Sequence, residues 1–313
     1  MRIIFWGTAS FGLPALESLL KSGHEILAVV TQPDRPQGRG KKIVPSPIKS
    51  WAVQKKIPVY QPEKIRDYAF VNLLKSLAPE IMVIIAYGQI LSLDILSIPP
   101  RGCLNVHASI LPKYRGAAPI PWAILKGETR TGVTTMFMDE GMDTGPILLI
   151  GETDIALEEN AGELHDRLAK MGADLLIQTL TGLEAGWLKP QPQDHAQATY
   201  APKITKEMAR INWQMPARQL FNHLRAFDPW PGAFTNLNCR LLKMFRPRFF
   251  AGMEEINAEP PGTIVETTNE EITIATGRGY LKVREVQLEN RPRMKVAEFL
   301  HGHQLVPGMR LGE

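Results

Sequence analysis

The chain's longest strongly apolar run is Ile81-Met82-Val83-Ile84-Ile85-Ala86. Continuous runs rich in β-branched residues are typical of parallel strands that helices bury on both faces. We therefore expect a central strand of an α/β sheet here. The run is far too short to cross a bilayer, which argues against a membrane protein.

Strand-like and helix-like segments alternate on both sides of this run. The expected strands cover residues 2–6, 26–30, 57–60, 104–107, 132–138 and 147–151. Helices are expected from Pro14, over residues 63–78, and from Asn160, where Asn160 and Glu163 have capping-box spacing. This alternation predicts a doubly wound, Rossmann-like α/β domain.

The composition changes near Gly186. Lys189–Pro202 contains three prolines and little apolar content, as is typical of a linker. Beyond it, helices are expected over 206–213 and 216–226, and strands over 233–236, 241–245, 262–266, 272–275 and 280–288. Short strands separated by turns predict a small, OB-like β-barrel. We therefore expect an α/β domain over 1–188, a linker over 189–203 and a barrel domain over 204–313.

The bulk composition is that of a globular protein. Of 313 residues, 44% are hydrophobic and 22% charged. Cys103 and Cys239 are the only cysteines, which argues against a disulfide framework. Met1–Gly7 enters a strand directly, without the apolar stretch and cleavage site of a secretory signal, so we expect a cytoplasmic protein. The net charge of +4 favours a nucleic-acid partner only weakly.

The turn Gly7–Gly12 follows the first strand and invites a nucleotide-binding interpretation. It lacks the middle glycine of G-x-G-x-x-G and the Gly-Lys-Ser/Thr of a P-loop. A tight strand-to-helix turn is the simpler interpretation.

Asn105 and His107 end a predicted buried strand, and strand alternation puts both on the same side. Functional groups of open α/β sheets gather at the carboxyl ends of strands. An amide beside an imidazole could stabilise an oxyanion and move protons near neutral pH. The spacing alone leaves open a structural alternative, a satisfied buried histidine with an asparagine that caps a turn.

The segment Met138–Gly145 is an acidic loop that carries Asp139, Glu140 and Asp143. Three carboxylates could bind a metal, but the ligand spacing of an EF-hand is absent. One carboxylate could instead reach a histidine and orient it. A solvated hairpin tip is the other possibility that the pattern leaves open.

A basic loop follows Asp34, with Gly38 and Gly40 for flexibility. Its cations are Arg35, Arg39, Lys41 and Lys42. Such a loop suits phosphate contacts, although its charge also fits a solvated surface loop. Further candidate phosphate contacts are Arg246, Arg248, Arg291, Arg293 and Lys295.

Several of these segments together resemble the 10-formyltetrahydrofolate-dependent formyltransferases. The matching motifs are Asn105-x-His107, Ser109–Pro112, Arg115–Ile120 and Asp143–Gly145. Further matches, which extend the resemblance over essentially the whole chain, are Thr31–Pro36, Gly38–Lys42, Ala86–Gly88 and Phe227–Gly232. One departure is Ile110, where leucine is commoner in the family, and this exchange conserves volume.

The resemblance implies a reaction. The α-amino group of methionyl-initiator tRNA would attack the formyl carbon of 10-formyltetrahydrofolate, for translation initiation, with no metal and no acylated residue. Asn105 and His107 would hold the carbonyl oxygen, while Asp143 would tune His107 and help to relay the proton of the amine.

The resemblance also implies binding residues. The folate pocket would be lined by Ser109, Ile110, Leu111, Pro112, Ile85, Ala86, Tyr87 and Gly88. The tRNA would contact Arg35, Arg39, Lys41, Lys42 and the C-terminal barrel domain. We expect the protein to be a monomer.

Three other functions compete with this interpretation. A formyltransferase for a small amine, or a hydrolase that releases formate from the same folate, would need neither the basic loop nor the second domain. A non-catalytic RNA-binding protein would not need Asn105, His107 and Asp143 at motif spacing.

Overall fold

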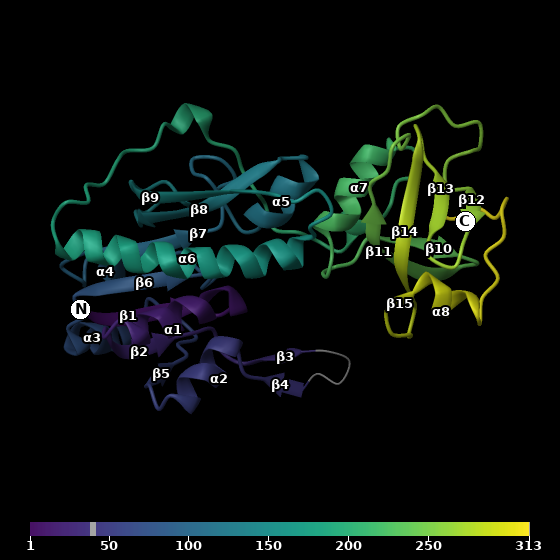
Figure 1. Ribbon diagram of the computed structural model, residues 1–313. Coiled ribbons are helices and arrows are strands. Elements are labelled where there is room, and N and C mark those ends of the chain that lie inside the picture. The colour runs from purple at the N-terminus through teal and green to yellow at the C-terminus, as the bar shows by residue number, and fades with distance from the viewer. Residues whose placement is uncertain (38–41, 313) are drawn as a thin grey trace. The chain divides into compact units, whose positions relative to one another are not determined.

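The computed structural model describes residues 1–37 and 42–312, and the chain divides into two compact units (Figure 1). The first unit comprises Met1–Pro119, Thr131–Thr153 and His165–Pro202, and the second comprises Ile120–Arg130, Asp154–Leu164 and Lys203–Glu313. Among the described residues, no helix has the length and apolar character needed to span a membrane.

The first unit is built on a seven-stranded sheet of order β5-β2-β1-β6-β7-β8-β9. Its strands are β1 (Arg2–Gly7), β2 (Glu25–Val30), β5 (Val59–Tyr60), β6 (Ile81–Ile85), β7 (Cys103–His107), β8 (Arg130–Phe137) and β9 (Ile147–Asp154). The strands from β5 to β7 pair in parallel, and β8 pairs antiparallel to β7. The predicted Rossmann-like sheet is confirmed, and the run that begins at Ile81 forms its buried strand β6.

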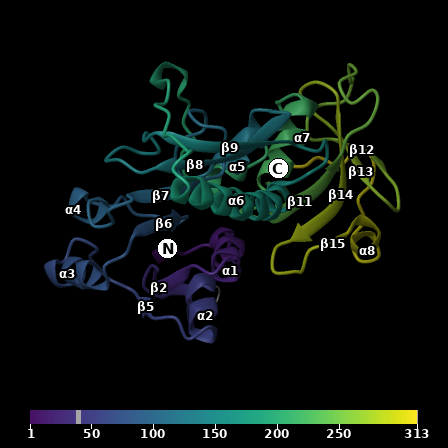
Figure 2. The ribbon, with the colours of Figure 1, turned by 60° about the vertical axis from the view of Figure 1, so that its left-hand side comes forward.

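Helices cover the sheet on both faces. The helices that begin in this unit are α1 (Leu13–Lys21), α2 (Pro47–Gln54), α3 (Tyr68–Leu77) and α4 (Leu93–Leu96), with 3-10 turns at Ser10–Gly12 and His195–Gln197. Figure 2 shows α3 and α4 on the opposite side of β1, β2 and β6 from α1 and α2. One face buries Trp6 against Phe70 of α3, while Phe5 on the other face lies beside Gly12 at the start of α1.

A small hairpin, β3 (Arg35–Gln37) with β4 (Lys42–Val44), flanks the basic loop. Its base is held by Asp34, whose carboxylate accepts hydrogen bonds from Lys49 at 2.5 Å and Gln61 at 2.7 Å.

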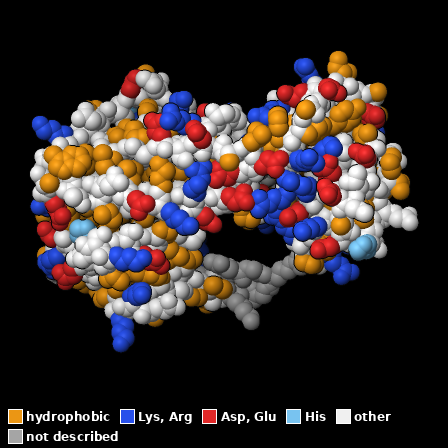
Figure 3. Space-filling view, viewed as in Figure 1, with side chains coloured by type: hydrophobic (Ala, Val, Ile, Leu, Met, Phe, Trp, Pro, Cys, Tyr) orange, Lys and Arg blue, Asp and Glu red, His pale blue; other side chains and the backbone are white. Residues whose placement is uncertain are grey.

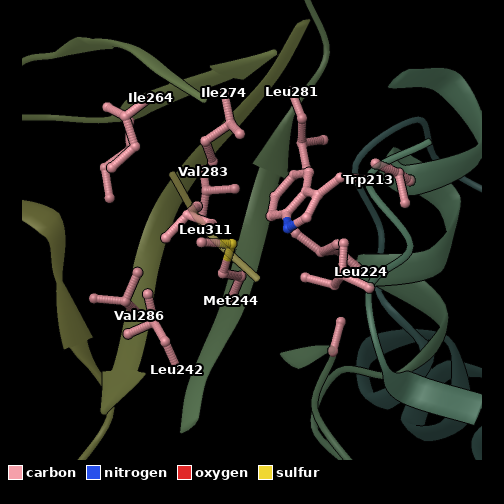
Figure 4. Close-up of a cluster of buried hydrophobic side chains, with 14 of the residues drawn as sticks. Trp213, Leu224, Leu242, Met244, Ile264, Ile274, Leu281, Val283, Val286 and Leu311 are labelled. Carbon is pink, nitrogen blue, oxygen red and sulfur yellow. The ribbon is translucent and has the colours of Figure 1, made fainter. Parts of the chain in front are cut away.

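The second unit contains an antiparallel sheet that curls into a half-barrel. Its strands are β10 (Phe234–Leu237), β11 (Arg240–Arg248), β12 (Ile264–Thr267), β13 (Ile272–Ala275), β14 (Tyr280–Leu288) and β15 (Met294–Lys295), in the order β10-β11-β14-β13-β12 with β15 beside β14. Its helices are α7 (Ala217–Ala226), α8 (Val296–Leu300) and a 3-10 turn at Glu207–Ala209, and α5 (Pro119–Leu125) belongs mostly to this unit. Figure 4 shows the core between α7 and the sheet, where the buried indole of Trp213 donates a hydrogen bond to Thr235 at 3.0 Å.

Two predicted helices differ from the structure. The helix expected from residue 63 begins only at Tyr68, because the Asp67 side chain caps the amide of Ala69 at 2.8 Å. The helix expected over 206–213 is a single 3-10 turn, because the amide of Ile211 instead donates to the carbonyl of Phe234 in β10 at 2.8 Å.

The long helix α6 (Ala161–Glu184) begins with the expected capping box. Asn160 Oδ1 accepts from the amide of Glu163 at 2.9 Å, and the Glu163 carboxylate accepts from the amide of Asn160 at 3.0 Å. The Asn160 side chain is buried, and its Nδ2 also donates to Asp228 at 3.1 Å.

We expect Asn160→Ala to lower the stability of the protein by about 1 kcal/mol or more, because it removes the cap and one hydrogen bond of a buried carboxylate. Asn160→Ser keeps a capping oxygen and should lose less. The measurement is the thermal unfolding midpoint of each variant. Equal losses in the two variants would show that the cap contributes nothing.

Candidate active site

Asn105, His107 and Asp143 come together at one place in the first unit. Asn105 and His107 lie on β7, and Asp143 lies in the loop that follows β8. The Asn105 amide donates to Asp143 Oδ1 at 3.3 Å, and His107 Nδ1 lies 3.7 Å from Asp143 Oδ2. The structure thus places the three residues in mutual contact or close to it.

A hydrogen bond at Nε2 fixes the orientation of the His107 ring. Nε2 lies 2.9 Å from the carbonyl oxygen of Tyr114, and a carbonyl can only accept, so Nε2 carries the proton of that hydrogen bond. His107 is only 6% exposed. The nitrogen left to face Asp143 and Asn105 is therefore Nδ1.

The carboxylate of Asp143 is held by a backbone group. The amide of Gly116 donates to Asp143 Oδ2 at 2.8 Å. The Asp143 side chain is 16% exposed and its φ is +54°, a left-handed conformation that is uncommon for a non-glycine residue.

The other carboxylates of the loop have different environments. Asp139 is exposed and accepts hydrogen bonds from Gly141 at 3.0 Å and Thr144 at 2.6 Å, so it shapes the loop. Glu140 is exposed. Of the three acidic residues that the sequence offered, Asp143 is the one that reaches the histidine.

The predicted folate segment 109–112 is a tightly bonded loop. Thr134 of β8 donates to the carbonyl of Ser109 at 2.7 Å and accepts from the amide of Leu111 at 3.1 Å. The Ser109 hydroxyl donates to the carbonyl of Lys113 at 2.6 Å. These bonds fix the loop that directly follows His107.

The other predicted folate segment, residues 85–88, leaves the carboxyl end of β6, where the sheet reverses its strand order. Ligands of open α/β sheets bind at such a switch point. Ala86 and Gly88 are exposed and left-handed, with φ of +49° and +88°. The Thr8 amide donates to the carbonyl of Ala86 at 3.2 Å. Burial raises the pKa of Tyr87 to about 12, so its phenol stays neutral.

A hollow of about 680 Å³ lies beside the acidic loop, large enough for a small molecule. It is lined by Leu93, Asp94, Leu96, Ser97, Met138, Asp139, Glu140 and Gly141. The sequence interpretation did not include these residues of α4, because nothing in their pattern indicates a pocket.

Of the predicted tRNA contacts in the basic loop, Arg35 and Lys42 belong to the described part of the chain. Arg35 is an exposed residue of β3, and Lys42 begins β4. Arg39 and Lys41 lie outside the described residues.

In the second unit, three of the candidate phosphate contacts form ion pairs. Arg246 pairs with Glu163 at 2.6 Å, and Arg248 pairs with Glu271 at 3.3 Å. Arg293 binds Asp228 at 2.7 Å and Glu285 at 2.6 Å. Figure 3 shows Lys and Arg interspersed with Asp and Glu over this part of the surface.

Comparison with known proteins defines the class of protein. The model of the formyl transferase family matches residues 1–180, and the model of the formyl transferase C-terminal domain matches residues 203–304. The chain therefore belongs to the formyltransferase family, and it is a transferase.

Curated relatives named methionyl-tRNA formyltransferase are similar to the chain over its whole length. The relative from Pelobacter propionicus is 49% identical over 310 residues, which cover 99% of this chain and 96% of the relative. The relative from Syntrophus aciditrophicus is 48% identical over 312 residues, which cover 100% of this chain and 99% of the relative.

Solved structures share the fold at low identity. WlaRD, a sugar 3N-formyl transferase, gives a TM-score of 0.67 at 19% identity over 93% of this chain and 99% of its own. HypX from Aquifex aeolicus in complex with tetrahydrofolic acid gives 0.65 at 18% over 96% of this chain and 47% of its own. A methionyl-tRNA formyltransferase from Clostridium thermocellum gives 0.55 at 18% over 80% of this chain and 95% of its own.

If Asn105 and His107 hold the formyl oxygen, as the family resemblance implies, His107→Ala and Asn105→Ala should each lower kcat for formyl transfer by on the order of 10²–10³-fold. The measurement is turnover with purified variants whose circular dichroism matches that of wild type. His24→Ala is the control, since His24 contacts the N-terminal amine instead of the site. Wild-type turnover in either site variant would remove that residue from the site.

Asp143→Asn keeps the shape of the side chain and removes its charge. If Asp143 takes up the proton of the amine, we expect a comparable loss of kcat and a changed pH profile, because the variant lacks that carboxylate. Glu140→Gln is the matched comparison and should stay far closer to wild type. Full activity in Asp143→Asn with a large loss in Glu140→Gln would assign the role to the other carboxylate.

Proposed function

We propose that this chain transfers the formyl group of 10-formyltetrahydrofolate to the α-amino group of methionyl-initiator tRNA. The product is N-formylmethionyl-tRNA for translation initiation, and the enzyme works as a cytoplasmic monomer. The observation that carries the proposal is the near-50% identity, over practically the whole chain, to relatives named methionyl-tRNA formyltransferase. The match of residues 203–304 to the C-terminal formyl transferase model extends the family assignment to the second domain.

The reaction has three events that the protein must support. The amine nitrogen attacks the formyl carbon, negative charge develops on the formyl oxygen, and the bond from that carbon to the folate nitrogen then breaks. The Asn105 amide and the His107 imidazole stabilise the oxygen as its negative charge grows. The Asp143 carboxylate accepts the proton that the amine loses, and the folate nitrogen finally gains one.

The formyl donor binds beside these residues. The loop segments 85–88 and 109–112, which follow β6 and β7, are the candidate folate contacts, and the hollow next to the acidic loop offers further room for the ligand. The complex of HypX with tetrahydrofolic acid supports a folate ligand for this fold.

The charged tRNA approaches through the basic loop that carries Arg35, Arg39, Lys41 and Lys42. Arg39 carries a planar guanidinium, which can engage phosphate or a base edge in a way that an ammonium cannot, and it stands between Gly38 and Gly40 in the sequence, so we take it as the principal contact. Arg293, Arg246 and Arg248 are engaged by carboxylates, so the barrel contacts with tRNA come first from Arg291 and Lys295.

The test is transfer of labelled formate from 10-formyltetrahydrofolate to charged tRNA. Initiator methionyl-tRNA should be formylated far faster than elongator methionyl-tRNA or free methionine. Equal rates on all three acceptors would favour a small-amine formyltransferase. Release of formate in the absence of any acceptor, at the same rate, would favour a hydrolase.

We expect Arg39→Ala to weaken transfer to charged tRNA and to flatten its salt dependence. The plot of log binding constant against log salt concentration has a negative slope, and each lost phosphate contact should reduce the magnitude of that slope by about 0.7–0.9. Hydrolysis of the formylfolate, measured in the same preparations, should hardly change. A parallel fall of both activities would mean that Arg39 supports the α/β domain and does not dock tRNA.

A further inference from the structure

The segment Gln191–Ala201 has the composition of a linker, yet it is hydrogen-bonded within the first unit near both of its ends. Gln191 and Ile147 exchange two backbone hydrogen bonds, at 2.7 and 2.8 Å. At the other end, the Arg115 amide donates to the carbonyl of Thr199 at 2.8 Å, and the Ala201 amide donates to the carbonyl of Arg115 at 2.7 Å. We call residues 191–201 the strap. It joins the loop that carries Asp143 to the loop that follows His107.

Gln193 is the buried polar side chain of the strap, with 7% exposure. Its Nε2 donates to the carbonyls of Asp143 at 2.9 Å and Gly145 at 2.7 Å. Its Oε1 accepts from Arg115 Nη2 at 2.6 Å and Nε at 3.2 Å. Two carbonyls require a donor and a guanidinium requires an acceptor, so these partners fix the orientation of the amide.

The pairing of β7 with β8 does not by itself place Asp143 beside Asn105 and His107. Because β8 runs antiparallel to β7, Phe137 at the end of β8 lies opposite Leu104, near the start of β7. The loop must then turn back along β7 for Asp143 to reach Asn105. The carbonyls that Gln193 holds belong to this returning part of the loop.

The strap supports the side chain of Asp143 as well as its backbone. The Gly116 amide that binds the carboxylate follows Arg115, whose amide and carbonyl are both bonded to the strap. The Arg115 side chain is 2% exposed and lies against Gln193 and His195. Movement of Gln193 would therefore disturb both supports of Asp143.

We propose that Gln193 is a positioning residue of the active site: it makes no contact with the reacting atoms but holds Asp143 in register with Asn105 and His107. This inference rests on the proposed function, in which Asp143 accepts the proton of the attacking amine. A displacement of about 1 Å in a reacting group lowers rate by up to about 10²-fold. The effect should appear in kcat, because substrate binding does not involve Gln193.

The first experiment compares Gln193→Ala with wild type. We expect kcat for formyl transfer to fall about 10–100-fold, with KM for formylfolate and for charged tRNA nearly unchanged. Gln197→Ala is the matched control, since Gln197 lies in the same strap, is exposed, and donates from its side chain to Asp194 at 2.8 Å. An unchanged kcat in Gln193→Ala, or an equal loss in Gln197→Ala, would overturn the proposal.

A double-mutant cycle with Asp143→Asn separates positioning from general support. If Gln193 acts through Asp143, then Gln193→Ala should cost little further activity once Asp143 is already replaced. Losses that multiply in the double variant would mean that Gln193 acts independently of Asp143, and the proposal would fail.

Gln193→Glu guards against an effect of misfolding. It keeps an oxygen for Arg115 but loses the N–H donors to both carbonyls, so kcat should fall even at temperatures well below the thermal midpoint of the variant, where the protein is folded. Wild-type kcat in this variant would contradict the proposal.

Amide hydrogen exchange of the loop 139–146 needs no substrate and therefore separates the two claims. We expect faster exchange in Gln193→Ala than in wild type or Gln197→Ala. If wild type fails to formylate methionyl-tRNA but the loop exchanges faster in the variant, the proposed function fails and the support of the loop by Gln193 stands. Unchanged amide exchange of the loop in Gln193→Ala would show that Gln193 does not support the loop, whatever the acceptor of the formyl group proves to be.

Discussion

The hydrogen bond from the Gly116 amide to the Asp143 carboxylate connects two loops, and the two bonded residues lie 27 positions apart in the sequence. One loop follows β7 and fixes the His107 ring through the carbonyl of Tyr114. The other follows β8 and brings in the acidic side chain. Without this bond the carboxylate would have the weak 3.3 Å contact with Asn105 as its direct hydrogen bond within the site. The placement of the Asp143 carboxylate beside Asn105 and His107 therefore depends on a backbone N–H.

This dependence marks the limit of what the sequence predicts. The parallel sheet follows from apolar runs such as the one at Ile81, and the capping box follows from the side chains of Asn160 and Glu163. Strand alternation placed Asn105 and His107 on one side. The Gly116 amide and the Tyr114 carbonyl could not be predicted, because every residue has these groups and only the tertiary structure selects them.

Tertiary contacts also explain the remaining differences. The pattern over 206–213 is compatible with a helix, but pairing of Ile211 with β10 takes up the backbone instead. In the same way, the count of basic residues in the second unit does not reveal that Arg293 is stacked on Phe245 and bound to Asp228. Composition gives the number of charges, and only the fold tells which of them are already neutralised.

The strap has a consequence for dividing the protein into fragments. A fragment that ended at Leu188, where composition places the end of the α/β domain, would contain Asn105, His107 and Asp143. It would lack Gln193 and the backbone of the strap, so buried carbonyls and a buried guanidinium would lose their partners, at about 1–3 kcal/mol for each unsatisfied group. A fragment of this enzyme that keeps the loop of Asp143 bonded as in the whole chain therefore extends at least through Ala201.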